Sequence, residues 1–141
     1  MNLLLDTNVL SEVQRPAPSA NVLAWLDTVD EDRTFISVAS IAELRRGIAL
    51  LEDGRRRASL AAWLAHDLPS RFAGRILPID HTVAELWGDL MAQSRRSGVA
   101  LPVMDGFFAA TALANNLTLV TRNVKDFAAF GVPLLNPWDA A

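Results

Sequence analysis

The stretch MNLLLDTNVL at residues 1–10 decides the fold of this 141-residue chain. A continuous run of leucines ends abruptly at Asp6, and Thr7 and Asn8 follow. A short run that is apolar at every position is typical of a strand buried on both faces, as in a parallel sheet. The sequence therefore places an acidic side chain where a buried strand ends.

The same apolar pattern recurs along the chain, and helical patterns separate the copies. The further expected strands are TFIS at 34–37, RILPI at 75–79 and LTLVT at 117–121. Apolar residues at helical spacing predict helices over 19–29, 41–51, 55–72, 81–98 and 105–116. Strands that alternate with helices predict an α/β fold in three layers, with a parallel β-sheet flanked by helices on both faces.

Length and composition limit the class of protein. A chain of 141 residues that is 51% hydrophobic is the size of one compact domain, and we expect a single domain over 1–141. No apolar run reaches the ~20 residues of a membrane span, and no export signal is recognisable, so we expect a cytoplasmic protein with no membrane partner. The absence of cysteine excludes disulfides and thiolate metal sites.

The charged residues give two open interpretations. The formal net charge of −3 provides no overall attraction to nucleic acid. Of the 13 basic residues only Lys125 is a lysine, and the arginines cluster at 45–46, 55–57 and 95–96. Guanidinium groups bind phosphate well, but the same clusters also fit solvated helix faces.

Polar side chains recur where the expected strands end or a helix begins. Glu43 follows the strand TFIS, Asn123 and Asp126 follow LTLVT, and Asp105 opens a helix. In an open parallel sheet, ligands bind at the carboxyl ends of the strands. Together with Asp6, these residues predict a site at one edge of the sheet.

Each of these residues also has a purely structural explanation. Asp6 could cap the segment TNVLSEV, Asp105 could cap its own helix, and TRNVKDF could be a turn followed by a single helical turn. Ser40 and Glu43 match the S-x-x-E capping box. Separate structural roles for every acid at one edge of one sheet explain the pattern less well than a shared site.

Converging acids would require a cation. Two carboxylates about 5 Å apart at an effective dielectric of ~20 repel each other by roughly 3 kcal/mol. All candidate ligands are oxygen donors, since neither His66 nor His81 falls at a strand end. Oxygen ligands favour a hard ion, and we therefore expect Mg²⁺, for which Mn²⁺ substitutes.

Four segments, taken together, resemble a known family. They are LLLDTNVLSE at 3–12, ISVASIAELRRGI at 36–48, LPVMDGFFAATALANNLTLVTRNVKDF at 101–127 and GVPLLNPW at 131–138. In this order and spacing they are similar to PIN-domain proteins, and within that superfamily to the VapC and FitB group of toxin-antitoxin ribonucleases. The resemblance covers essentially the whole chain and implies a PIN-like fold.

The resemblance also implies roles for individual residues. Asp6 and Asp105 correspond to metal ligands, and Glu43 to a third acid that acts on the metal or on its bound water. The polar positions that support the acids in such proteins correspond to Thr7, Asn8, Ser40 and Thr121. One departure is Asn123, which stands where the family often has a fourth acid; Asp126 lies three residues beyond.

The function implied by the resemblance is that of a Mg²⁺-dependent endoribonuclease toxin. Such proteins hydrolyse RNA phosphodiester bonds, form homodimers, and are neutralised by a cognate VapB- or FitA-like antitoxin in a tetramer or larger complex. The candidate phosphate contacts are Arg45, Arg46, Arg95, Arg96 and Arg122. The alternative is a catalytically weak PIN-like module that binds RNA or protein. A receiver domain or a haloacid-dehalogenase-like phosphatase would need acidic pairs that this chain lacks.

Four tryptophans complete the pattern. Trp25, Trp63 and Trp87 lie in expected helices, where each could pack into the core or anchor an interface. We expect core packing for these three. Trp138 is expected to pack the C-terminal segment against the rest of the domain.

Overall fold

The computed structural model describes residues 1–139 and contains a five-stranded parallel sheet. The strand order is β3-β2-β1-β4-β5, and every neighbouring pair is parallel. The strands are β1 (Leu3–Leu5), β2 (Thr34–Ser37), β3 (Ile76–Leu77), β4 (Thr118–Val120) and β5 (Leu134–Leu135). The predicted parallel α/β architecture is confirmed. β5 was not among the expected strands, because two residues are too short for a periodic pattern.

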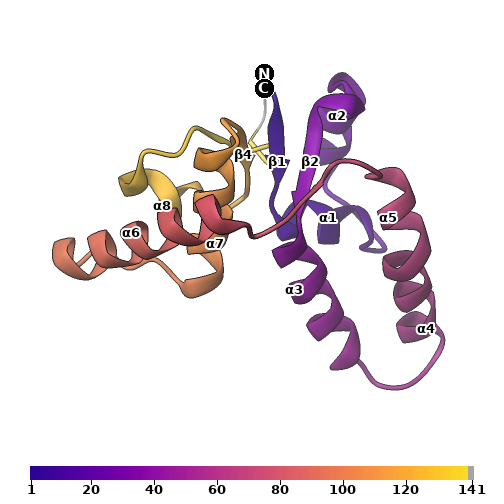
Figure 1. The fold of residues 1–141 in the computed structure, drawn as a ribbon. Coiled ribbons are helices and arrows are strands. Elements are labelled where there is room, and N and C mark those ends of the chain that lie inside the picture. Colours follow the sequence, from indigo (N-terminus) through magenta and orange to yellow (C-terminus); the bar gives the residue numbers. More distant parts are fainter. Residues whose placement is uncertain (140–141) are drawn as a thin grey trace.

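Helices connect the strands (Figure 1). The α-helices are α1 (Thr7–Val13), α2 (Ala20–Thr28), α3 (Val38–Ala49), α4 (Arg55–Ala62), α5 (Leu68–Arg71), α6 (His81–Ser97), α7 (Val103–Ala114) and α8 (Val124–Phe127). Shorter helical turns are η1 (Glu31–Arg33), η2 (Trp63–Asp67) and η3 (Ala128–Phe130). No helix within residues 1–139 is both long enough and apolar enough to span a bilayer.

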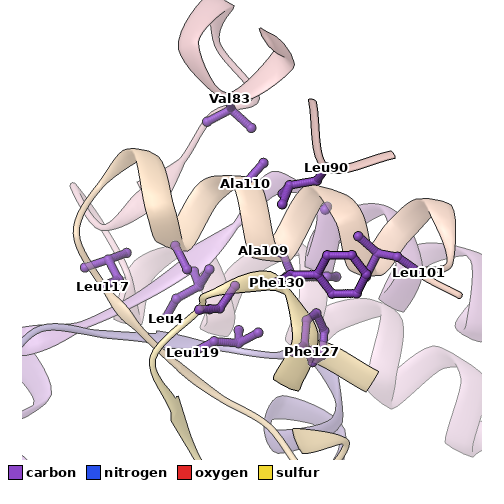
Figure 2. Close-up of a cluster of buried hydrophobic side chains, with 14 residues drawn as sticks. Leu4, Val83, Leu90, Leu101, Ala109, Ala110, Leu117, Leu119, Phe127 and Phe130 are labelled. Carbon is purple, nitrogen blue, oxygen red and sulfur yellow. The ribbon is translucent and has the colours of Figure 1, made fainter. Parts of the chain in front are cut away.

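The two faces of the sheet bury separate apolar cores, which confirms the predicted three layers. Leu4 and Leu119 point into the core that α6, α7 and α8 cover, where Phe127 is also buried (Figure 2). Phe108 is fully buried in the same core. Leu3 and Leu5 point the other way, into the core formed with α1, α3, η2 and α5. Because both faces are covered, β1 is apolar at all three positions.

The helix predicted over residues 55–72 is present but not uniform. It consists of α4, a π-helical turn at η2, and α5. Pro69 lies in the first turn of α5 and has no N–H to donate to the preceding turn. The missing N–H of a proline interrupts the regular hydrogen bonds of a helix, and such an interruption is a known cause of a local irregularity like this π-helical turn.

Two predicted helix boundaries are wrong by a few residues. α7 begins at Val103, directly after Pro102, rather than at Asp105. α3 begins at Val38, because the Ser37 side chain accepts a hydrogen bond from the Ala39 N–H and caps the helix. Asp105 and Glu43 therefore both lie within their helices, so neither is a cap.

The strand order determines where a ligand site can form. From β1 the chain moves outward through β2 to β3 and then returns to β4 on the other side of β1. The direction of winding thus reverses between β1 and β4. In open α/β sheets, a crevice forms at this reversal, outside the carboxyl ends of the strands. Asp6 and Thr121 are the first residues after β1 and β4, respectively.

Candidate metal centre

A cleft of about 430 Å³ opens at the predicted end of the sheet. It brings together residues from α1, α3, α7, the segment after β4, and the C-terminal segment. Its lining residues are Asp6, Thr7, Asn8, Ser11, Glu12, Arg15, Glu43, Asp105, Arg122, Asn123 and Trp138. Of the predicted acids, Asp6, Glu43 and Asp105 all line this one cleft.

Asp6 is held rigidly at the end of β1. Its side chain is 5% exposed, and its Oδ1 accepts a hydrogen bond from the Thr7 N–H at 2.7 Å. Its Oδ2 accepts hydrogen bonds from Thr121 Oγ1 at 2.7 Å and from Asn8 Nδ2 at 3.4 Å. Asp6 is also the N-cap of α1, as its structural explanation predicted, and it lines the cleft as well.

In the metal-free protein, the two aspartates of the cleft both have a raised pKa. Burial raises the pKa of Asp6 to about 6, against opposing hydrogen bonds from Thr121 and Thr7, and the nearby Glu43 carboxylate adds to the rise. Burial likewise raises the pKa of Asp105 to about 6, with further contributions from the charges of Asp6, Asp126 and Glu43. The carboxylates therefore lie close enough to repel one another.

A directional chain of hydroxyl groups orients Glu43. Thr7 Oγ1 donates to Glu43 Oε1 at 2.6 Å, and Ser40 Oγ lies 2.8 Å from the same Thr7 oxygen. A hydroxyl has a single proton, so Ser40 must be the donor to Thr7. The capping-box interpretation of Ser40 is therefore wrong, since Ser40 lies inside α3 and is completely buried.

Asp105 is carried on the first turn of α7, which is packed tightly against α6. The Trp87 indole Nε1 donates to the Val103 carbonyl at 3.1 Å, and its ring stacks on Phe107 with centroids 5.0 Å apart. A Cβ atom at Gly106 would lie 3.0 Å from Trp87 and from Met91. The absence of a side chain at residue 106 thus lets α6 approach the turn that presents Asp105.

The tryptophans pack as expected. Trp25, Trp63 and Trp138 are partly buried against one core, and Trp87 is partly buried against the other. The prediction of core packing is confirmed for all of them.

The segment after β4 places its two candidate site residues, Asn123 and Asp126, differently. The Asn123 N–H donates to Thr121 Oγ1 at 3.1 Å, and Asn123 lines the cleft. Asp126 is exposed and does not line the cleft, although its charge reaches Asp105. Its own N–H donates to the Asn123 carbonyl, which closes the single helical turn of α8.

Within residues 1–139, two arginines line the cleft, and the sequence pattern indicated just one of them. Arg122 was among the expected phosphate contacts, whereas Arg15 was not. A clue to Arg15 was its position shortly after α1, the helix that begins directly behind Asp6. The four other expected contacts are exposed on α3 and α6 and do not line the cleft: Arg45, Arg46, Arg95 and Arg96.

The donor set of the cleft fits a hard divalent cation. Asn8 Oδ1 is buried and has no hydrogen-bond partner within residues 1–139, so a neutral oxygen remains available beside Asp6. No three Asp, Glu or His side chains in this part of the chain lie close enough to enclose an ion by themselves. Mg²⁺ commonly uses one or two carboxylates and keeps several waters. Asp6 and Asp105 fit this requirement, and Glu43 lines the same cleft.

Fold and site together define the class of protein to which the chain belongs. A parallel sheet with carboxylates gathered at its winding reversal is an architecture suited to binding a divalent cation. Residues 3–132 match the PIN domain family. The chain belongs to this family.

Known relatives extend over nearly the full chain. It is 40% identical over 136 residues to Toxin FitB of Neisseria gonorrhoeae, covering 96% of this chain and 98% of FitB. It is 38% identical over 139 residues to VapC ribonuclease Y4jK of Sinorhizobium fredii, covering 99% of each protein. The crystal structure of FitAcB from N. gonorrhoeae superimposes with a TM-score of 0.92 at 40% identity, covering 98% of this chain and 99% of that chain.

Proposed function

We propose that this protein is a Mg²⁺-dependent endoribonuclease that hydrolyses RNA phosphodiester bonds. The observation that carries the proposal is the shared cleft of Asp6, Asp105 and Glu43, in which both aspartates have a pKa raised to about 6. Such groups gain most from a bound cation, because its charge offsets their burial and mutual repulsion. The similarity to VapC ribonuclease Y4jK supports the choice of RNA as the substrate.

Each residue of the site has a defined task in this proposal. Asp6 and Asp105 hold the ion, and Mn²⁺ substitutes for Mg²⁺. A bound divalent ion lowers the pKa of an attacking water and stabilises charge on the phosphodiester. Glu43, fixed by Thr7 and Ser40, accepts a proton from the attacking water. Thr121 and Asn8 keep the Asp6 carboxylate in one orientation.

The biological role that we propose is that of a toxin neutralised by a cognate antitoxin. Its similarity to Toxin FitB and to the chain in the FitAcB crystal structure supports this role. In the proposed assembly, the protein is a homodimer that forms a tetramer or larger complex with a VapB- or FitA-like antitoxin. Its site of action is the cytoplasm, where the RNA substrate is made and used.

The test is cleavage of RNA by the purified chain. We expect total bacterial RNA to show discrete new ends when Mg²⁺ or Mn²⁺ is present, and none when both are chelated. Expression of the chain alone should arrest bacterial growth, and co-expression of a neighbouring antitoxin gene should restore it. If RNA is retarded in a gel but never shortened, the chain is instead a catalytically weak binding module.

Asn123→Asp is expected to tighten Mg²⁺ binding roughly tenfold, because it adds a carboxylate to a cleft that already attracts cations. Calorimetric titration of the metal into each variant measures this change. Asn116→Asp adds the same charge at the far end of α7 and should leave the affinity unchanged.

Asp126→Ala should reduce cleavage less than Asp6→Asn does, because Asp126 does not line the cleft. Unchanged metal affinity in Asn123→Asp, combined with loss of cleavage in Asp126→Ala, would identify Asp126 as the fourth acid. Our assignment of this segment would then be wrong.

A further inference from the structure

Two arginines and a tryptophan line the same cleft as the carboxylates. Core packing accounts for part of the Trp138 side chain, but neither the fold nor the metal explains why two guanidinium groups lie beside the acids. We propose that Arg15 and Arg122 bind backbone phosphates of the RNA strand, and that Trp138 is a positioning residue that fixes Arg122. This inference rests on the proposed function, since it assumes an RNA substrate. It assigns functional roles to Arg15 and Trp138, for which the sequence analysis indicated none.

Arg15 is anchored but still available for a ligand. Its Nη1 donates to Glu12 Oε1 at 3.2 Å, while 60% of its side chain remains exposed. A guanidinium has five N–H donors, so most of them are free to contact an anion. Glu12 is itself buried, and its second oxygen accepts the Ser19 N–H at 2.8 Å. The buried carboxylate therefore fixes one edge of the guanidinium without occupying the others.

Arg122 is held in a different way, by an aromatic ring. Its guanidinium carbon lies 5.5 Å from the centroid of the Trp138 ring. Within residues 1–139, no carboxylate lies within ion-pair distance of Arg122. A guanidinium stacked on a ring keeps its in-plane N–H groups free, and these form the fork that matches a phosphate.

Hydrogen bonds hold the C-terminal segment in place, so that the Trp138 ring stays beside the Arg122 guanidinium. Asn136 Nδ2 donates to the Arg122 carbonyl at 3.4 Å, and Asn136 Oδ1 accepts the Trp138 N–H at 2.9 Å. Asn21 Nδ2 on α2 donates to the Trp138 carbonyl at 2.7 Å. Asn136 thus ties the backbone of Arg122 to the residue whose ring stacks on its side chain.

Glu12 joins the two arginines into one assembly. The Ser19 N–H, the Arg15 guanidinium and the Trp138 side chain all act to lower the pKa of Glu12, against the opposing effect of burial. Glu12 therefore stays ionised and its charge is matched by its own donors. Its carboxylate accepts a hydrogen bond from Arg15, and all four residues, Glu12, Arg15, Arg122 and Trp138, line the same cleft.

The charge balance of the cleft indicates what Arg15 and Arg122 do there. Four carboxylates line the cleft, those of Asp6, Glu12, Glu43 and Asp105, and their charge outweighs that of a single divalent ion. Without the arginines, the site would therefore repel an RNA backbone. Arg15 and Arg122 are the only basic residues that line the cleft within residues 1–139. They supply the positive charge that a phosphate needs there, and the acids remain free for the metal.

The test measures RNA binding in a protein that does not cleave. In the Asp6→Asn background, fluorescence anisotropy with a labelled single-stranded RNA of mixed sequence gives the affinity at several salt concentrations. Arg15→Gln and Arg122→Gln should each weaken binding about tenfold and lower the salt slope by about 0.7, the value for one phosphate contact on a single strand. Arg33→Gln is the matched control, because Arg33 also pairs with an acid three residues earlier but lies before β2.

The positioning role of Trp138 is tested by a double-mutant cycle. Trp138→Leu should weaken binding as much as Arg122→Gln does, and the two changes together should cost no more than one alone. Trp138→Phe keeps an aromatic face and should retain most of the affinity. If Trp138→Leu does not fold, Asn136→Ala takes its place in the cycle, since it releases the Arg122 carbonyl.

The outcomes separate this inference from the proposed function. If the unmutated protein cleaves RNA but Arg15→Gln and Arg122→Gln bind like Arg33→Gln, the phosphate contacts are wrong and the nuclease proposal stands. If both variants lose binding but no RNA is ever cleaved, the contacts stand and the hydrolytic function is wrong. Additive losses from Arg122→Gln and Trp138→Leu would refute the positioning role of Trp138.

Discussion

Asp6→Asn and Asp105→Asn are each expected to reduce RNA cleavage by roughly 10³-fold or more, because a bound divalent ion supplies several kcal/mol of charge stabilisation. Both variants remove an anionic oxygen from the proposed ion site and change the shape of the side chain very little. Initial rates with a labelled RNA in saturating Mg²⁺ measure the effect. Either variant cleaving at nearly the unmutated rate would show that the metal site is misassigned.

The matched control for Asp6→Asn is Asp80→Asn. Asp80 caps α6 as Asp6 caps α1, since its side chain accepts the Val83 N–H at 3.0 Å. Asparagine caps helices about as well as aspartate, so this change tests the loss of a charge at a cap outside the cleft. Asp80→Asn should retain full cleavage, which separates the loss of a metal ligand from the loss of a charged cap.

The metal-free protein is expected to lose stability as the pH rises from about 4 to about 6. The pKa of Asp6 is about 6 in the folded protein, compared with an ordinary value of 3.8. The folded state therefore binds this proton more tightly than the unfolded state does. The resulting stabilisation is complete below the ordinary pKa and disappears above the folded one. For a raise of this size the difference is about 3 kcal/mol.

Denaturant unfolding at a series of pH values, with divalent metals chelated, checks this expectation. Asp6→Asn removes the titrating group, so its free energy of unfolding should exceed that of the unmutated protein by about 3 kcal/mol at pH 7 and by little at pH 4. Added Mg²⁺ should stabilise the unmutated protein more than Asp6→Asn. A gap between the two proteins that does not change with pH would contradict the raised pKa of Asp6.

The fold was largely predictable from local patterns, because burial on both faces favours short strands that are rich in apolar residues. β1 is apolar at all three positions, whereas β2 begins with Thr34 and ends with Ser37, and β4 begins with Thr118. All three strands match the expected positions. β3 is shorter than the pattern RILPI suggested, and β5 carries no pattern of its own. Their pairing with β2 and β4 defines these short strands, and such long-range contacts cannot be predicted from a local pattern.

For the site, the sequence by itself determined which side chains stand at the carboxyl ends of strands. The abrupt change from apolar residues to Asp6, and the polar residues that follow LTLVT, are local features of neighbouring positions. The parallel arrangement then directs both strand ends to the same edge of the sheet. The gathering of Asp6, Glu43 and Asp105 in one cleft follows from strand direction and order.

Only the tertiary structure decided how these groups are held and what faces them. The donation from Ser40 to Thr7 to Glu43 links α1 with α3, and the stacking of Arg122 on Trp138 links the segment after β4 with the C-terminal segment. The raised pKa of Asp6 likewise depends on burial by residues far away in the sequence. Distance, hydrogen-bond direction and desolvation are properties of packed segments, and no pattern of adjacent residues encodes them.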